Sequence, residues 1–299
     1  MPRLFSIFLP IGFPATVKPD YLSYQFFDSI QALFSTLTGI LATKELLKGL
    51  GVGSEDASAS QAALTYLLKD GVSMMTRILF AHQFAPRFMC NIKSWRFMAD
   101  VFNDLGYFFE FFAATVSKDY FIWFATLSGM LRCCVGVCGG ASRMSLTMHF
   151  ALNHNESDLD AKDGSQEPLV NLCGMLFGWL MMKSLEKVVD ERLNALFVWT
   201  LFLVFTVFHL IFNYLAVSAV ELDCLNEQRC KILLKSYVME NQILSPKVVA
   251  EKENILWPIF TKKVIQLGCP LTMEVIECLK DDEIHIRIGD CLPIQIFLH

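Results

Sequence analysis

The stretch from Lys93 to Phe112, KSWRFMADVFNDLGYFFEFF, decides how the rest of the chain is interpreted. An α-helix turns about 100° per residue, so the polar side chains of this stretch fall within roughly a third of its circumference. We call them the polar stripe: Lys93, Arg96, Asp100, Asn103, Asp104, Tyr107 and Glu110. The other faces are apolar and rich in phenylalanine. This pattern suits the wall of a polar cavity inside a helical bundle, and an ordinary amphipathic surface helix is the alternative.

Composition favours a membrane protein. Of the 299 residues, 54% are apolar and 26 are phenylalanine, and only 18% are charged, against about 25% in soluble domains. The formal net charge of −5 gives a nucleic-acid partner no electrostatic support. The ten cysteines form no CxxC pair and no His/Cys spacing that suits zinc, so we interpret them as reduced structural side chains.

One segment is apolar enough to cross a bilayer without help from other helices. Residues Leu193–Val220 contain no Asp, Glu, Lys or Arg, and about 20 such residues span the hydrocarbon core. Thr206, His209 and Asn213 align on one face of this helix and should point toward protein rather than lipid. Two roles stay open for His209: a proton-sensitive group, or a hydrogen-bonded histidine that packs helices.

A second polar pattern lies on the helix predicted from about Ala59 to Phe84. Asp70 and Arg77 share a face but are two turns apart, too far for direct contact. Because a buried charge is unfavourable unless it is paired, we expect Arg77 to pair with Asp100 or Asp104 of the polar stripe. Exposure of Asp70 and Arg77 at a water-facing end of the helix is the alternative.

The segment Asn153–Pro168, NHNESDLDAKDGSQEP, is strongly polar and is predicted to be a loop before an apolar helix resumes at Leu169. Its aspartates suggest a calcium loop, but the spacing does not fit. Lys162 occupies the fifth position of such a loop, and Asp163 replaces the required glycine.

The character of the chain changes after residue 220, where charged residues become frequent. SPKVVAEKE begins a helix with Ser245 as its N-cap and Pro246 in its first position, and residues 283–289 and 292–298 predict short strands. We therefore predict a helical membrane domain at residues 1–220 and a soluble α/β domain at residues 221–299. The predicted fold class is mainly α: a multi-helix membrane-embedded bundle with a small C-terminal α/β tail.

Five segments, in order, resemble the root UV-B-sensitive family over about residues 7–185. They read FLPIGFPATVKPDYLSYQFFDSIQA, GILATKELLKGLGVG, LLKDGVSMMTRILFA, KSWRFMADVFNDLGYFFE and HFALNHNESDLDAKDGSQEPLVNLCGMLFGWL. The resemblance carries over the KDG…R, WR..AD..ND and D.AK..SQ patterns. These supply the candidate ligand-binding residues: Asp70, Arg77, Arg96, Asp100, Asn103, Asp104, Asp160, Lys162 and Gln166.

The resemblance implies a biological setting but no reaction. Plant members of the family are linked to the UV-B response, auxin transport and vitamin B6 homeostasis, they associate with one another, and animal and fungal homologues resemble membrane proteins. We expect a multi-pass membrane protein that binds or transports a small polar or anionic solute, with a non-transporting membrane scaffold or interaction protein as the alternative. Expected partners are membrane lipid, a family-member homo- or hetero-oligomer and the solute, but no nucleic acid.

An enzyme is not expected. The chain has no Ser/His/Asp order, no metal cluster and no phosphate-binding loop. Catalytic residues and metal ligands are therefore not assigned, and neither a cofactor nor an organelle follows from the residues or from the resemblance.

Overall fold

The structure is a computed structural model that describes residues 5–49, 59–88, 90–115, 118–256, 265–267 and 286–288. Within these ranges the fold is mainly α, as the sequence predicted. The chain divides into two compact units, Met1–Val220 and Glu221–His299, which are described separately below.

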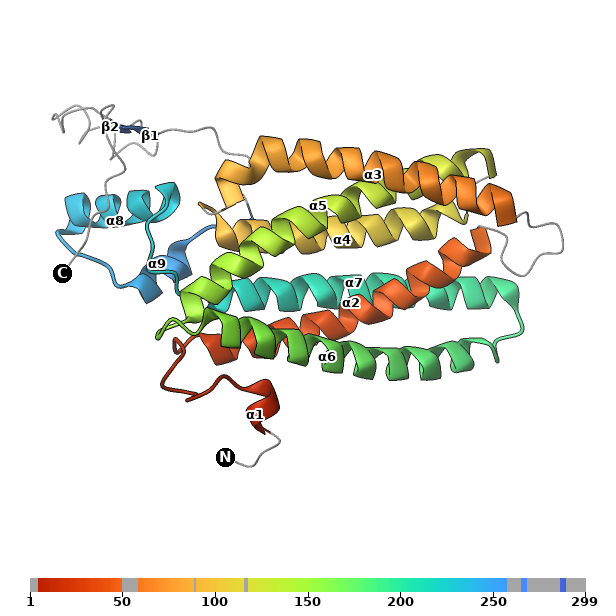
Figure 1. Cartoon of the computed structure of the whole chain (residues 1–299), viewed down its shortest axis with the longest axis horizontal. Helices are drawn as coiled ribbons and strands as arrows, with labels where there is room; N and C mark the ends of the chain where they lie inside the picture. Colours follow the sequence, from red (N-terminus) through yellow and green to blue (C-terminus); the bar gives the residue numbers. More distant parts are fainter. Residues whose placement is uncertain are drawn as a thin grey trace. The chain divides into compact units, whose positions relative to one another are not determined.

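Long helices that run alongside one another form the first unit (Figure 1). They are α2 (Tyr21–Gly49), α3 (Ala59–Phe88), α4 (Ile92–Ala113), α5 (Lys118–Phe150), α6 (Glu156–Leu185) and α7 (Glu191–Ala219), and the short helix α1 (Phe5–Phe8) precedes them. Helix α5 packs on α3 and α4, whereas α2 packs on α6 and α7. Helix α4 joins the two groups because it also packs on α2 and α7, so the polar stripe lies where both groups meet.

Apolar side chains fill the contacts between these helices. One cluster joins α2, α4, α6 and α7 and consists of Leu41, Ala42, Phe111, Leu185, Val198 and Phe202. A second joins α2, α4 and α5 and consists of Leu46, Ala113, Phe121 and Ala125. Both clusters lie toward the C-terminal half of α4, so the N-terminal half of the polar stripe is left to meet polar partners.

Glycine sets the close approach of α6 to α2. A Cβ atom added at Gly174 would lie 2.8 Å from Cγ2 and 2.9 Å from Cβ of Thr36, and one added at Gly178 would collide with Ile40. Gly174 and Gly178, four residues apart, therefore pack directly against α2, as small residues do where helix backbones approach closely.

Gly174→Ala is expected to destabilise the first unit by about 1–3 kcal/mol, because the Thr36 Cβ next to it is fixed to the backbone of α2 and cannot rotate away. Gly164→Ala on the same helix is the matched control, since a Cβ at Gly164 meets nothing within 4 Å. That control should be neutral or slightly stabilising through helix propensity. Unfolding of both variants in detergent micelles measures the difference, and equal effects would contradict the close-packing explanation.

The prediction of a loop at residues 153–168 is wrong. Helix α6 begins at Glu156, directly after Asn155, and continues through Pro168 to Leu185. Two features explain it. Glu156 and Asp158 lie in the first turn, where negative charge favours a helix, and polar residues further along find partners on α2 and α5. Asp160, Lys162 and Gln166 are consequently helical residues.

In the part of the chain that the structure describes, three helices are long and apolar enough to cross a membrane: Tyr120–Phe150, Glu156–Leu185 and Glu191–Ala219. Their apolar side chains point mostly away from the protein. In the most apolar window of α6, and likewise of α7, only 17% of the residues are buried. Helix α7 instead turns His209 and Asn213 inward, where both are 0% exposed. This arrangement, apolar outside and polar inside, is the reverse of an ordinary soluble helix.

The second unit contains α8 (Glu227–Glu240), α9 (Pro246–Lys252), β1 (Ile265–Leu267) and β2 (Ile286–Ile288), the two strands pairing in parallel. Pro246 occupies the start of α9 as predicted, and Arg229 is buried against Glu253 with 3.0 Å between Nε and Oε1. The described residues do not support the predicted α/β tail. The strands are three residues each, and the predicted strand at 292–298 lies outside the described part of the chain.

The cysteines whose surroundings are described are free thiols. In the second unit, burial raises the pKa of the Cys230 thiol, which keeps it protonated and unreactive. Cys134 and Cys138 are buried, whereas Cys90, Cys173 and Cys224 are exposed, so the interpretation of the cysteines as structural stays a prediction for the exposed ones.

Candidate functional site

The polar stripe of α4 faces the interior of the first unit. Lys93, Asp100, Asp104 and Glu110 are each at most 9% exposed. From Arg96 to Glu110 the stripe rises about 21 Å along the helix. Because buried charge is unfavourable without a partner, the groups that other helices bring to this stripe define the site.

Helix α7 supplies partners for the middle of the stripe. Nδ1 of His209 lies 2.8 Å from both carboxylate oxygens of Asp104. Since an ionised carboxylate only accepts hydrogen bonds, Nδ1 carries the proton and donates it to Asp104. One turn away, the side-chain amide of Asn213 donates to Asp100. Nε2 of His209 and Oδ1 of Asn213 are both buried without a hydrogen-bond partner in the described residues.

Helix α2 supplies partners for the start of the stripe. Nη2 of Arg96 donates to Oδ1 of Asp28 over 2.8 Å, and Gln31 donates to the same oxygen over 3.2 Å. Further along, Asn103 donates to the Ser35 hydroxyl over 3.2 Å. Nε of Arg96 is buried without a hydrogen-bond partner among the described residues, so the guanidinium has a donor to spare.

A pocket opens beside Arg96, with about 450 Å³ of empty space that includes open solvent, and we call it the polar pocket. Residues of α2, α4, α5 and α6 line it, and most of them are charged or carry an amide. They are Gln25, Asp28, Ser29, Gln31, Ala32, Arg96, Arg143, Asp163, Gln166, Glu167 and Val170. The pocket therefore connects the surface of α6 with the buried polar stripe.

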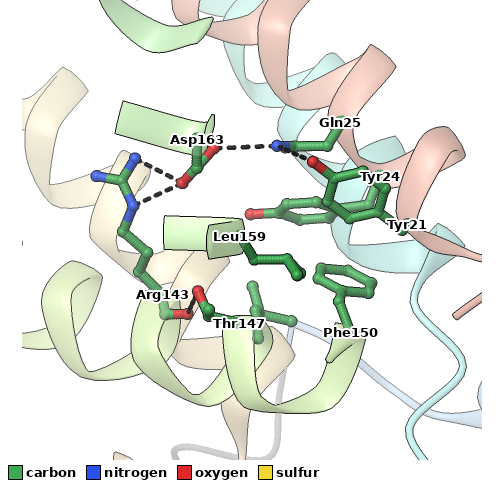
Figure 2. Close-up of a pocket in the computed structure, with 9 residues that line it drawn as sticks. Tyr21, Tyr24, Gln25, Arg143, Thr147, Phe150, Leu159 and Asp163 are labelled. Atoms are coloured by element: carbon green, nitrogen blue, oxygen red, sulfur yellow. Dashed lines mark hydrogen bonds and ion pairs between the residues drawn. The ribbon is translucent and has the colours of Figure 1, made fainter. Parts of the chain in front are cut away.

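A second pocket, with about 290 Å³ of empty space that includes open solvent, shares Gln25, Arg143 and Asp163 with the polar pocket (Figure 2). Its inner wall is aromatic, formed by Tyr21 and its neighbours Tyr24 and Phe150. Figure 2 shows Asp163 between Arg143 on one side and Gln25 on the other. Nε of Arg143 donates to Asp163 over 2.8 Å and Nη2 to Glu167 over 2.7 Å. Aromatic and charged surfaces thus meet at one carboxylate.

The far end of the polar stripe is saturated with partners. Glu110 is 1% exposed and accepts hydrogen bonds from Ser128 at 3.0 Å and from Arg132 at 3.3 Å. Lys69 of α3 adds an ammonium 3.6 Å from the same carboxylate, and Arg132 also lies over the ring of Tyr107. This end ties α3, α4 and α5 together.

A hydrogen-bonded chain closes the other end of the bundle. Lys18 lies 3.2 Å from Nδ1 of His149, and Nε2 of His149 lies 2.9 Å from Asp20. An ammonium can only donate, so Nδ1 accepts and the imidazole proton sits on Nε2, directed at Asp20. The segment that precedes α2 is thereby fixed to the end of α5.

The structure brings together only part of the predicted set. Arg96, Asp100 and Asp104 lie together where the polar stripe meets α2 and α7, a contact that we call the buried seam. Asn103 borders it, and Gln166 reaches the polar pocket through a contact with Gln25.

Asp70 and Arg77 do not join the seam, and the predicted pairing of Arg77 with Asp100 or Asp104 is wrong. Both side chains of α3 are exposed, since α3 turns Ser73 toward Gly129 of α5 instead. Asp160 is also exposed, and Lys162 does not line either of the pockets found in the described part of the chain.

Sequence reasoning missed several residues of the site. Asp28, Gln25, Arg143, Asp163 and Glu167 were not predicted, although Asp28 was visible as a charge early in an apolar helix. His209 and Asn213 were predicted to face protein, but not to bind the polar stripe. Their signal was an uncharged apolar helix with two strongly polar residues four apart on one face.

Comparison with known proteins identifies the family. A family model described as the vitamin B6 photo-protection and homoeostasis domain matches residues 1–241. RUS family member 1 of Dictyostelium discoideum is 42% identical over 258 residues, which cover 86% of this chain and 48% of that protein. The chain belongs to the root UVB sensitive family.

The root UVB sensitive relatives include two from Arabidopsis thaliana. Protein root UVB sensitive 3 is 36% identical over 85% of this chain and 56% of its own length. Protein root UVB sensitive 5 is 28% identical over 88% of this chain and 52% of its own length. The chain spans about half the length of the root UVB sensitive relatives it matches. No solved structure matches it.

The family match confirms the resemblance seen in the sequence and places a vitamin B6 homoeostasis domain on the first unit and α8. In the described part of the chain, no three His, Cys, Asp or Glu side chains are close enough together to hold a metal ion.

Proposed function

We propose that the first unit is a multi-pass membrane domain that binds and transports a small polar or anionic solute of the vitamin B6 type, and that it catalyses no reaction. The observation that carries this proposal is Arg96, a partly buried arginine that lines the polar pocket and whose Nε has no hydrogen-bond partner among the described residues. The description of the matching family domain supports the class of solute.

The distribution of polarity supports a membrane setting. Helices α6 and α7 expose rows of leucine, phenylalanine and methionine, which lipid covers at no cost. The charged and amide side chains of the seam point inward, where a polar solute would need them. In a soluble protein this arrangement would leave a large apolar surface in water.

The lining of the two pockets suits a phosphorylated pyridine. Arg96 and Arg143 are guanidinium groups, which bind phosphate through planar pairs of N–H donors. The rings of Tyr21 and Phe150 offer an aromatic wall to a flat heterocycle, and Asp163 between the pockets can accept a hydrogen bond from a ring N–H. Vitamin B6 phosphates carry all three of these features.

The test uses pyridoxine 5′-phosphate, which lacks the aldehyde that would react with surface lysines. It should raise the melting temperature of the whole chain in detergent micelles, since a ligand at 100 times its Kd stabilises the native state by about 2.7 kcal/mol. Arg96→Gln should weaken binding about ten- to a hundredfold, because a charged hydrogen bond contributes about 1.5–3 kcal/mol. Arg77→Gln, an exposed arginine outside the pockets, is the control.

Transport needs its own measurement. The protein in liposomes should take up labelled pyridoxine 5′-phosphate, and Arg96→Gln should reduce uptake while the amount of folded protein stays the same. Binding without uptake would leave a solute-binding membrane protein. No binding of this probe or of inorganic phosphate would overturn the proposal.

One observation favours the second candidate, a non-transporting membrane scaffold. The outward face of α3 carries Asp70 and Arg77 among exposed apolar side chains such as Met74 and Ile78. Lipid cannot pair these charges, whereas a protein partner, including another family member, can. If the scaffold hypothesis is correct, wild type binds no solute but does associate with its protein partner. Charge reversal at Asp70 or Arg77 should then abolish that association.

A further inference from the structure

Two hydrogen-bond acceptors, Nε2 of His209 and Oδ1 of Asp100, face one another inside the contact between α4 and α7. Because Nδ1 of His209 donates to Asp104, a neutral ring leaves a lone pair on Nε2. Nε2 lies 4.0 Å from Oδ1 of Asp100, and it is completely buried without a hydrogen-bond partner in the described residues. A lone pair beside an ionised carboxylate is repulsive, whereas one added proton makes the same contact attractive.

The charges around this contact are unbalanced. The groups that act on His209 are Asp100, Asp104 and Arg96, all on α4. Helix α2 adds Asp28, which acts on Asp100 and is bound to Arg96. Helix α6 also packs on α7 but makes no ion pair with His209 among the described residues. Of the charged groups named here, three are carboxylates and one is a guanidinium, so a proton on His209 brings this set closer to neutrality; Lys93, also on α4 and buried, adds a positive charge to the same stripe.

We propose that Asp100, Asp104 and His209 form a buried proton-binding site that controls how strongly Arg96 binds an anionic group in the polar pocket. The proton comes from water and is held on Nε2 of His209, directed at Asp100. No bond between heavy atoms forms or breaks. The anion half of this inference rests on the proposed function, whereas the proton site rests on the α4–α7 geometry alone.

The proton site and the anion-binding Arg96 lie one helical turn apart on α4. Asp100 follows Arg96 by four residues, so both lie on the same face of α4 and interact electrostatically. Protonation of His209 adds one positive charge that offsets the negative charge of Asp100 beside Arg96, and the guanidinium then attracts an anion in the pocket more strongly. Coupling between two sites is reciprocal, so a bound anion also favours the protonated cluster. Anion and proton are therefore expected to bind together.

The proton site is tested first without any solute. Thermal unfolding of the whole chain in detergent is measured from about pH 5 to about pH 8, the interval in which histidine changes charge. A proton bound more tightly by the native state stabilises it at low pH, and this contribution is lost as pH rises. The advantage of wild type over His209→Asn, which keeps a donor toward Asp104, should therefore shrink as pH rises.

A constant difference across this range overturns the proton site. If His209→Asn does not fold, Asp100→Asn replaces it, since an amide keeps the shape of the carboxylate and removes its charge. The pH dependence should then be weaker in Asp100→Asn than in wild type. Asp160→Asn, at an exposed position of α6, is the control and should follow wild type.

The coupling is tested with pyridoxine 5′-phosphate over the same pH interval. The affinity of wild type relative to that of Asp100→Asn should rise about 5- to 150-fold from the basic to the acidic end, the usual size of a coupling between sites. Asp100→Asn should show only the pH dependence that comes from the phosphate of the probe, whose second pKa is about 6. The ionisation of the probe itself is common to both proteins and cancels in the comparison.

The possible failures are distinguishable. Binding with the same pH dependence in wild type and Asp100→Asn overturns the coupling but leaves the proposed function intact. If neither pyridoxine 5′-phosphate nor inorganic phosphate binds, the proposed function and the anion half of this inference fail together. The solute-free unfolding experiment still decides the proton site.

Discussion

Asp104→Ala is expected to destabilise the first unit by about 3–5 kcal/mol, the usual effect of removing one partner from a buried ion pair. The carboxylate is 5% exposed, and it is the only described acceptor for Nδ1 of His209, which is 0% exposed. Without it the imidazole donor has neither water nor protein to bind. Unfolding in detergent by titration with a denaturing surfactant measures the loss.

A matched control separates pairing from loss of charge. Asp160→Ala removes a carboxylate that is exposed on α6, and it should change the free energy of unfolding by less than about 0.5 kcal/mol. The double variant Asp104→Leu with His209→Leu should recover much of the loss, because apolar replacement of both partners is often neutral. If the double variant is as unstable as the sum of the two single variants, the stability does not come from pairing.

This expected rescue bears on why the ionic groups are there. If apolar residues could replace Asp104 and His209 with little loss of stability, the pair is not retained for folding. A proton site or a solute site then gives the simplest physical reason to bury them. The double variant should therefore fold but lose the pH dependence expected of the proton site, which separates the two roles in one protein.

The helical period of the sequence was enough to find the polar stripe but not its partners. Periodicity told which residues share a face of α4, so Arg96, Asp100 and Asp104 were found together. It could not tell which helix that face meets. The pairing of Arg77 with Asp104 assumed that charge on an apolar helix must turn inward, yet α3 is apolar on most sides, and the close contact of Ser73 with Gly129 fixes its orientation instead.

The pockets could not have been derived from local sequence. Arg143 and Asp163 are 20 residues apart on different helices, and Gln25 comes from a third. The polar composition around Asp163 predicted a loop, because polar residues without visible partners usually lie in water. In the fold, Arg143 and Gln25 are those partners, and they allow a polar segment to be helical.

Glu110→Ala is expected to have an effect as large as that of Asp104→Ala, about 3–5 kcal/mol. The Glu110 side chain is 2% exposed and holds Arg132 and Lys69, so its removal leaves two positive groups beside one another at the junction of α3, α4 and α5. Ser128 also loses its acceptor. Because Arg132 is 43% exposed on its side chain and can turn partly to solvent, the lower end of this range is expected.

Glu167→Ala is the matched comparison, because both glutamates pair with an arginine and only their burial differs. Burial should therefore decide how much unfolding free energy is lost. Glu167 also binds an arginine, Arg143, over 2.7 Å, but its side chain is 48% exposed. An exposed pair of this kind contributes at most about 1 kcal/mol, since water solvates both ions when the pair opens. Unfolding of both variants in the same micelles gives the ratio. If Glu110→Ala and Glu167→Ala lose similar amounts of unfolding free energy, water reaches the surroundings of Glu110 as freely as it reaches the surface. That result would contradict a buried seam that holds its charges in a medium of low polarity.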